Sequence, residues 1–150
     1  MDTFRDDDLA AIIPHRAQGY HRVAGELRNS LLLDTSYKIP GGGFCATVED
    51  LAKFAIAVQT DKLVQAKTRE QMFSRQKLNN GQESTYGLGW QVGERIGRQV
   101  VSHSGAQQRV STLLYMLPSE GFAVVLMCNL EGTNLSRLAG QIADIVAPTK

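Results

Sequence analysis

The residues of this chain that most directly suggest chemistry are the triplet His103-Ser104-Gly105. A serine hydroxyl can act as a nucleophile, and an imidazole can serve as its base. The triplet ends a segment with the pattern of a strand, however, and neighbouring residues of a strand point to opposite faces of a sheet. His103 therefore cannot serve as the base for Ser104, and a polar strand end before a turn is the simplest alternative interpretation.

Other patterns that mark catalytic or cofactor sites fit the sequence less well. Ser102 stands where a nucleophile elbow around Ser104 would require glycine. Three glycines between positions 87 and 93 miss the spacing of a dinucleotide-binding loop by one residue. No two histidines have metalloprotease spacing, so we expect neither a metal nor a cofactor. The basic segments 14–16 and 21–22 could bind an anion, although a solvated loop face explains them more simply.

A helix is predicted directly after a break in the chain at Gly41-Gly42-Gly43. Three residues without a Cβ lose much backbone entropy inside a helix or strand. Thr47 is then a candidate N-cap, with Asp50 three residues later as a variant of the capping box. Apolar residues follow at the i, i+3, i+4 and i+7 spacing of an amphipathic helix, namely Leu51, Phe54, Ala55 and Val58. A shorter helix is expected at about 68–75.

From Tyr86 onward the hydrophobic period changes to two, which predicts a strand over 86–92. Three more strand candidates follow, and the last two are so apolar that both faces of their sheet should be covered: Gln99–Ser104, Val110–Leu117 and Phe122–Cys128. The segment 118–121 has the chemistry of a hairpin loop. Apolar residues at helical spacing between 135 and 146 predict a terminal helix capped by Thr133 or Asn134.

Together these elements predict an α+β domain over residues 1–150, with an antiparallel sheet of three to four strands and a C-terminal helix on one face. We expect loop and short strands over 1–40, including a small hairpin between 18 and 33. Helices should follow over 41–80, and the sheet with its terminal helix over 86–147. A composition of 43% hydrophobic and 21% charged residues is typical of a globular protein.

Charge and hydropathy narrow the partners that we expect. A net charge of +1 gives no reason to expect binding to nucleic acid. The longest apolar run, Phe122–Cys128, is far shorter than the roughly 20 residues that span a bilayer. The acidic N-terminal residues lack the pattern of a signal peptide, and the compartment is left open. Cys45 and Cys128 are interpreted as small core residues, because two distant cysteines imply neither a disulfide framework nor a zinc site.

Several motifs, in one order along nearly the whole chain, resemble those of the serine hydrolase superfamily of class C β-lactamases, penicillin-binding proteins and esterases. The segment from Gly41 to Phe54 resembles its glycine-rich turn and the helix start that follows. Tyr-Gly-Leu-Gly-Trp at 86–90 resembles a strand of the family, and the triplet at 103–105 resembles its His/Lys-Ser/Thr-Gly motif. Pro118 and Asn129 match the hairpin after that motif. The chain is similar to the C-terminal half of these enzymes.

This resemblance implies roles for the residues at the end of the predicted strand. His103 and Ser104 would line one wall of an active site, with His103 standing where many relatives have lysine. Gly105 would keep the strand free of side chains so that substrate can lie close to it. The backbone N–H of Ala106 would be one of two oxyanion-hole donors.

Two features of the sequence depart from the family pattern. Gln107 and Arg109 stand where many relatives have small residues or glycine, and both are candidate substrate-binding residues. The arginine would narrow the pocket or contact an acidic substrate. The family carries its nucleophile in a Ser-x-x-Lys motif at the start of a helix. Ser74 and Lys77 fit that motif literally but fall after a short predicted helix. We therefore expect Ser74 not to be a nucleophile and the nucleophile motif to be missing from this chain.

Two functions are compatible with these residues. The first is part of a β-lactamase-related serine hydrolase, inactive alone, whose complete relatives act on β-lactam, ester or D-amino acid peptide bonds. The second is a non-catalytic module that binds a small ligand or peptide with the pocket wall around His103. In complete relatives N-terminal strands extend the sheet. An unpaired sheet edge should therefore favour a homo-oligomer or association with the missing N-terminal portion.

Overall fold

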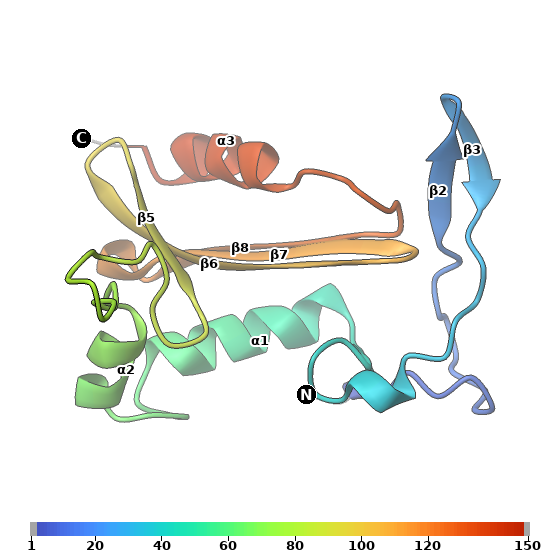
Figure 1. Cartoon of the computed structure of the whole chain (residues 1–150), viewed down its shortest axis with the longest axis horizontal. Coiled ribbons are helices and arrows are strands. Elements are labelled where there is room, and N and C mark those ends of the chain that lie inside the picture. Colours follow the sequence, from blue (N-terminus) through green and yellow to red (C-terminus); the bar gives the residue numbers. More distant parts are fainter. Residues whose placement is uncertain (1–2, 149–150) are drawn as a thin grey trace.

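The main sheet of this protein has four antiparallel strands in the order β5-β6-β7-β8. The computed structural model describes residues 3–148. Within that range the strands of the sheet are β5 (Gln91–Arg95), β6 (Arg98–Gln107), β7 (Val110–Leu117) and β8 (Phe122–Cys128). Figure 1 shows the long strands edge-on, with α3 on one face and α1 on the other. The predicted α+β class, with a terminal helix on one face of an antiparallel sheet, is confirmed.

Two apolar layers hold the helices to this sheet, because successive side chains of a strand point to opposite faces. The layer under α3 (Ser136–Val146) contains Val100, Leu113, Tyr115, Leu117, Val124, Leu135, Ala139 and Ala143. The layer over α1 (Val48–Gln59) contains Ala55, Val58, Phe73, Trp90, Val101, Leu114 and Met116. Strand β7 contributes to both layers, as its nearly continuous apolar run predicts.

Helix α1 begins where the sequence predicts, after a cap at Thr47. Its Oγ1 accepts a hydrogen bond from the backbone N–H of Asp50 at 3.4 Å. The carboxylate of Asp50 does not complete a capping box but accepts from the backbone N–H and the hydroxyl of Thr3, each at 2.7 Å. The Thr3 hydroxyl in turn accepts from the backbone N–H of Thr47 at 3.0 Å. The N-terminal segment is thereby tied to the start of α1.

The strand predicted over 86–92 is wrong in its first half, where the chain forms a turn. The backbone N–H of Gly87 donates to the carbonyl of Trp90 at 2.7 Å, and Gly89 has a φ of +82°. Glycines at every second position fit a tight turn as well as a strand, because they also tolerate positive φ. The strand proper, β5, begins at Gln91.

Both shorter helix predictions needed small corrections. The helix expected at 68–75 is α2, which spans Ala66–Met72. The N-cap of α3 is Leu135 and not Thr133 or Asn134, although Asn134 Oδ1 does accept the backbone N–H of Ser136 at 3.1 Å. The short 3-10 turn η2 (Pro118–Glu120) with Gly121 at a φ of +60° closes the β7–β8 hairpin where a loop is predicted.

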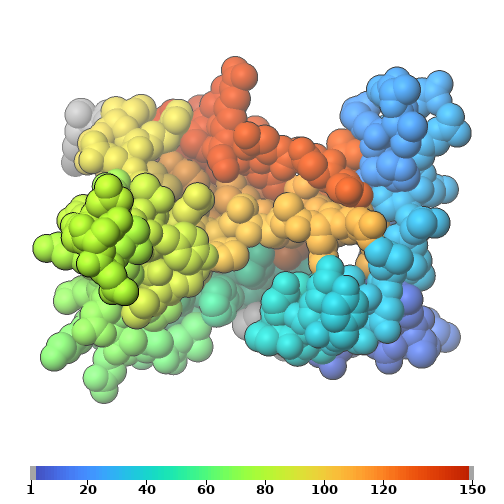
Figure 2. Space-filling model, in the orientation of Figure 1, coloured from blue at the N-terminus to red at the C-terminus, as the bar shows by residue number. Residues whose placement is uncertain are grey.

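Two small antiparallel sheets and the 3-10 turn η1 (Ser36–Lys38) make up the N-terminal region. The paired strands are β1 (Arg5–Asp6) with β4 (Phe44–Cys45), and β2 (Tyr20–Val23) with β3 (Glu26–Asn29). The β2–β3 hairpin lies within the segment where the sequence predicts one. It forms one end of the molecule, coloured blue, opposite the green segment around α2 (Figures 1 and 2). Tyr20 joins it to the main sheet, because its N–H donates to the carbonyl of Asn129 at 2.8 Å.

No helix within residues 3–148 has the length and apolar character needed to cross a membrane.

Acidification should destabilise this fold through Asp50 and Asp144. Hydrogen bonds from Lys53 and Thr3 lower the pKa of Asp50, and hydrogen bonds from Arg95 lower the pKa of Asp144. A carboxyl with a lower pKa in the folded state stabilises the fold above its unfolded pKa of about 4, and this contribution disappears as the pH falls through the folded value. Urea titrations should therefore give a free energy of unfolding that declines below about pH 4.

The decline should be shallower in Asp50→Asn, which has no charge to lose at this position. Asp61→Asn is the matched control, because Asp61 also pairs with a basic side chain but is largely exposed. An Asp50→Asn profile as steep as that of the wild type would contradict the assignment.

Candidate functional site

The triplet His103-Ser104-Gly105 lies inside a strand and not at its end. Strand β6 continues to Gln107, three residues beyond the end predicted at Ser104. Every residue from 103 to 107 is paired with β7. The predicted strand was too short because polar residues and glycine resemble a turn, whereas pairing with the buried β7 keeps them extended.

The opposite side of this part of β6 has no strand partner among the described residues. Strand β5 pairs with β6 only as far as Ser102, which faces Gln91. From His103 to Gln107 the backbone groups on that side remain open. An extended ligand can pair with such an edge through its own main chain.

The side chains of His103 and Ser104 lie on opposite faces of β6, as the alternation predicts. Val101 belongs to the layer over α1, so His103, two residues later, points to the same face. Val100 belongs to the layer under α3, so Ser104, four residues later, points to that face. The imidazole is exposed. Ser104 borders a pocket of about 180 Å³ between β6 and the start of α3, whose other lining residues are Gly105, Ala106, Thr112, Leu113, Thr133, Asn134, Leu135 and Ser136.

Gly105 lies close to the side chain of its neighbour on β7. A Cβ at this position would lie 2.4 Å from the Oγ1 of Thr112, which is directly opposite in the register. Contacts this close do not occur between real side chains, so any larger residue must move Thr112 or the strand. Glycine at position 105 therefore leaves both Thr112 and the edge of β6 undisturbed.

The amide of Gln107 is engaged by the glycine-rich loop. Its Nε2 donates to the carbonyl of Gly42 at 2.9 Å. Gly42 has a φ of +138°, and a Cβ there would lie 3.1 Å from the Oε1 of the same side chain. A Cβ on Gly43 would lie 2.6 Å from the carbonyl of Thr35. The loop thus packs tightly against the end of β6.

Arg109 is buried in an ion pair at the tip of the β6–β7 hairpin. Its Nη2 lies 3.1 Å from the carboxylate of Asp7, which also contacts Arg16 at 2.6 Å. Gly19 packs on it so closely that a Cβ would lie 2.1 Å from the Cβ of Arg109. This placement favours a structural role for Arg109 over the substrate contact expected from the sequence. Nothing in the acidic run of residues 6–8 indicates which carboxylate is buried.

Tyr86 and Trp90 belong to the site but were missed because the sequence placed them on a strand. Their rings lie 6.3 and 6.4 Å from the imidazole of His103 between ring centroids. The signal that could have found them is the pair of glycines at 87 and 89, which permit a turn.

Ser74 and Lys77 form no hydrogen bond with each other among the described residues, so the structure gives no sign of a nucleophile and its activator. Ser74 follows the end of α2, and its hydroxyl donates to the carbonyl of Glu70 in that helix. Lys77 forms an isolated antiparallel β-bridge, through the backbone, with Glu83 in the next loop. No group of three or more His, Cys, Asp or Glu side chains in the part of the chain that the structure describes could hold a metal ion.

Sequence comparison relates most of the chain to known proteins. The beta-lactamase family model matches residues 7–147. The human serine beta-lactamase-like protein LACTB, mitochondrial, is 27% identical over 183 residues, which cover 95% of this chain and 34% of that protein. Penicillin-binding protein 4* of Bacillus subtilis (strain 168) is 33% identical over 96 residues, or 62% of this chain and 21% of that protein. The chain spans about a third of the length of the human relative.

Solved structures share the fold at lower identity. The octameric penicillin-binding protein homologue from Pyrococcus abyssi aligns with a TM-score of 0.73 and 22% identity, over 87% of this chain and 30% of that one. A D-stereospecific amidohydrolase from Streptomyces sp. aligns with a TM-score of 0.75 and 17% identity, over 99% of this chain and 45% of that one. At these identities the likeness concerns the fold alone.

Replacing Gly105 by alanine should destabilise the chain by about 1–3 kcal/mol, the usual cost of overpacking. Because the obstacle is the Oγ1 of Thr112, Gly105→Ala combined with Thr112→Ala should recover part of the loss in a double-mutant cycle measured by urea unfolding. Gly93→Ala is the matched control, since an added Cβ on this β-strand glycine meets nothing within 4 Å. Additive effects of the two substitutions would refute the proposed contact.

Proposed function

The chain belongs to the beta-lactamase family, and from this premise we propose that it supplies one wall of the active site of a serine β-lactamase-like hydrolase. The observation that carries the proposal is the edge of β6 at 103–107, which is open on one side and carries glycine at its centre. The substrate classes proposed are β-lactams, esters and D-amino acid peptides or amides. A substrate would pair with this edge, next to His103 and Ser104.

The proposed contribution of Ala106 is electrostatic. Its backbone N–H would donate to the oxygen that becomes negatively charged when a carbonyl is attacked. Loss of one such donor typically costs about 10²–10³-fold in rate, because the charge develops only in the transition state. The pairing of Ala106 and its neighbours with β7 supports this role, since it keeps this backbone extended.

We further propose that the chain alone is inactive. The imidazole of His103 lies on the other face of the strand from the hydroxyl of Ser104, and the hydroxyl of Ser74 donates a hydrogen bond to the carbonyl of Glu70 in the preceding helix α2. Within residues 3–148 the hydroxyl of neither serine is hydrogen-bonded to a basic side chain. The nucleophile of the complete site would come from a part of the family fold outside these elements.

This chain should bind substrates without turning them over. With a chromogenic β-lactam, a short-chain nitrophenyl ester and a D-amino acid anilide, we expect no product above the uncatalysed rate. In NMR titrations at least one of these classes should shift the amide signals of residues 103–107 in a saturable way, and Gly105→Ala should weaken this binding whereas Gly93→Ala should not. Turnover abolished by Ser74→Ala or by Ser104→Ala would overturn the proposed inactivity. Unchanged signals at 103–107 with all three classes would overturn the assignment of the wall.

Binding without cleavage is the second candidate function, and the separation of His103 from Ser104 favours it. The two candidate functions differ in the state of the substrate to which the edge of β6 is complementary. The active-site wall of a hydrolase is complementary to the transition state, so a phosphonate analogue of a D-peptide should bind more tightly than the peptide itself. A pure binding module should show equal or weaker affinity for the phosphonate.

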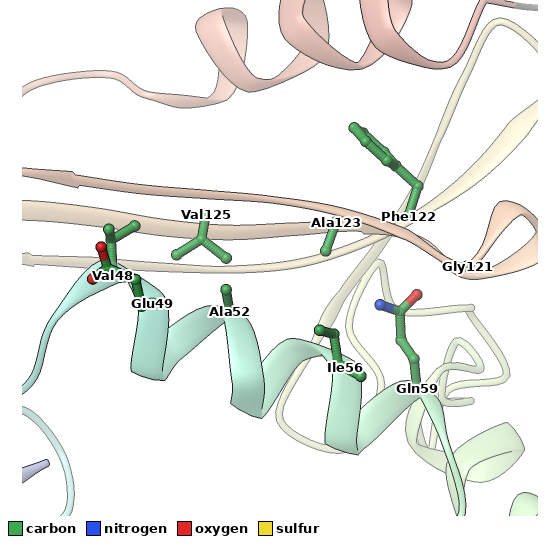
Figure 3. A pocket seen from close by; sticks show the side chains of 9 residues that line it. All are labelled: Val48, Glu49, Ala52, Ile56, Gln59, Gly121, Phe122, Ala123 and Val125. Carbon is green, nitrogen blue, oxygen red and sulfur yellow. The ribbon is translucent and has the colours of Figure 1, made fainter. Parts of the chain in front are cut away.

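A second surface supports association with another polypeptide segment. Helix α1 and strand β8 border an apolar groove of about 420 Å³, shown in Figure 3, whose lining residues are Val48, Glu49, Ala52, Ile56, Gln59, Gly121, Phe122, Ala123 and Val125. Among the described strands, β8 pairs only with β7. Its sequence contains no charge, proline or glycine to protect the edge. We propose that this edge takes up a further strand, from a second copy or from the N-terminal portion of the family fold.

Light scattering should therefore give a mass above that of the monomer at high protein concentration. Ile56→Lys should lower the mass, because Ile56 lines the groove and 57% of it is exposed, so the change does not disturb the core. Ile145→Lys on α3 is the matched control, with an isoleucine that is 79% exposed outside the groove. A wild-type chain that stays monomeric at high concentration would count against self-association and leave the N-terminal portion as the proposed source of the strand.

A further inference from the structure

The loop that carries Tyr86 and Trp90 is held firmly against the end of α2. The backbone N–H of Leu88 donates to the carbonyl of Met72 at 3.1 Å, and that of Gly87 donates to the carbonyl of Trp90 at 2.7 Å. A Cβ on Gly87 would lie 2.1 Å from the carbonyl oxygen of Met72. Only glycine permits this approach, so the loop has one well-defined path.

The indole of Trp90 is fixed between two further aromatic rings. Trp90 is 6% exposed. The ring of Phe54 on α1 is stacked with it at 6.5 Å and 19°, and the ring of Phe73 meets it edge-on at 5.7 Å and 84°. Such offset and edge-to-face pairs are the arrangements that aromatic quadrupoles favour. The indole is therefore a rigid part of the layer between α1 and the sheet.

The imidazole of His103 meets this rigid group at the open edge of β6. Trp90 lies perpendicular to it at 89°, with 6.4 Å between centroids, and Tyr86 lies at 69° and 6.3 Å. Among residues 3–148 these two rings are the aromatic contacts of His103, and none of the hydrogen bonds within that range involves its imidazole. The aromatic neighbours of this imidazole are thus one buried ring and one ring that is 39% exposed.

We propose that Tyr86 and Trp90 are positioning residues that hold the imidazole of His103 in one orientation at the open edge of β6. The proposal rests on the proposed function, in which that edge receives the substrate. A side chain that is already ordered loses less entropy on binding, an advantage of about 2- to 10-fold in affinity for one immobilised group. The Tyr-Gly-Leu-Gly-Trp segment then acts through His103 without touching the ligand.

The orientation of the imidazole can be measured without any ligand, from the NMR signals of its carbon-bound ring protons. His103→Asn identifies these signals among the three histidines of the chain. In the wild type the ring currents of Tyr86 and Trp90 should displace them from the positions of a free imidazole. Tyr86→Leu and Trp90→Leu should each remove part of this displacement, and Trp90→Phe should restore most of the part lost in Trp90→Leu.

The controls separate positioning from general loss of structure. Tyr37→Leu removes a tyrosine that is 77% exposed elsewhere, and it should leave the signals of His103 unchanged. The signals of His15 and His21 should stay in place in every variant. Because Tyr86 is partly exposed, Tyr86→Leu should keep the melting temperature of the wild type. If Trp90→Leu does not fold, the result for Tyr86→Leu decides the test.

Affinity for the probe that shifts residues 103–107 should fall about 2- to 10-fold in Tyr86→Leu and remain unchanged in Tyr37→Leu. Ring-proton signals of His103 that are the same in Tyr86→Leu as in the wild type would overturn the positioning role. A wild-type chain that binds no probe would instead overturn the proposed function, while the ring-proton signals would still report on the orientation of His103.

Discussion

The structure depends on the burial of β7 on both of its faces. Leu113 and Leu117 point into the layer under α3, and Leu114 and Met116 into the layer over α1. Full burial of one such side chain contributes about 1.5–3 kcal/mol, so this single strand supplies a large part of the apolar stabilisation. Strand β7 contacts α1 and α3 on its two faces and pairs with β6 and β8 on its two edges. An extended β6 follows, because each of its residues from 101 to 107 is paired with β7.

This dependence explains how a polar, glycine-containing segment can form a well-defined edge. On its own, the segment from His103 to Gln107 has weak strand propensity. Pairing with β7 imposes the extended conformation, and the glycine at 105 leaves room for the side chain of Thr112 directly opposite. Gln107 then fixes the glycine-rich loop at the far end of the same segment. The edge is extended although β5 pairs with it only as far as Ser102.

Much of the fold could be predicted from the sequence because its strongest signals are local. The bounds of β7 and β8 coincide with two apolar runs, and α1 begins at a side-chain cap that the sequence displays. The turn at 86–90 could not be predicted, since glycine suits both a strand and a turn, and its contact with Met72 decides between them. The pairing of Arg109 with Asp7 joins residues 102 positions apart and leaves no local pattern.

The difference between local and long-range signals also applies to the residues of the candidate site. Alternation along a strand is a local rule, and it is enough to place His103 and Ser104 on different faces of β6. The neighbours of each residue are not local: Tyr86 and Trp90 come from a turn, and the pocket beside Ser104 comes from the segment before α3. The two side chains therefore meet different parts of the fold across one open edge. A ligand paired with that edge would lie between the two side chains, so His103 and Ser104 would each contact a different side of it. The two side chains could then not act on the same reacting atom, and a catalytic partner for either one would have to come from another part of the family fold.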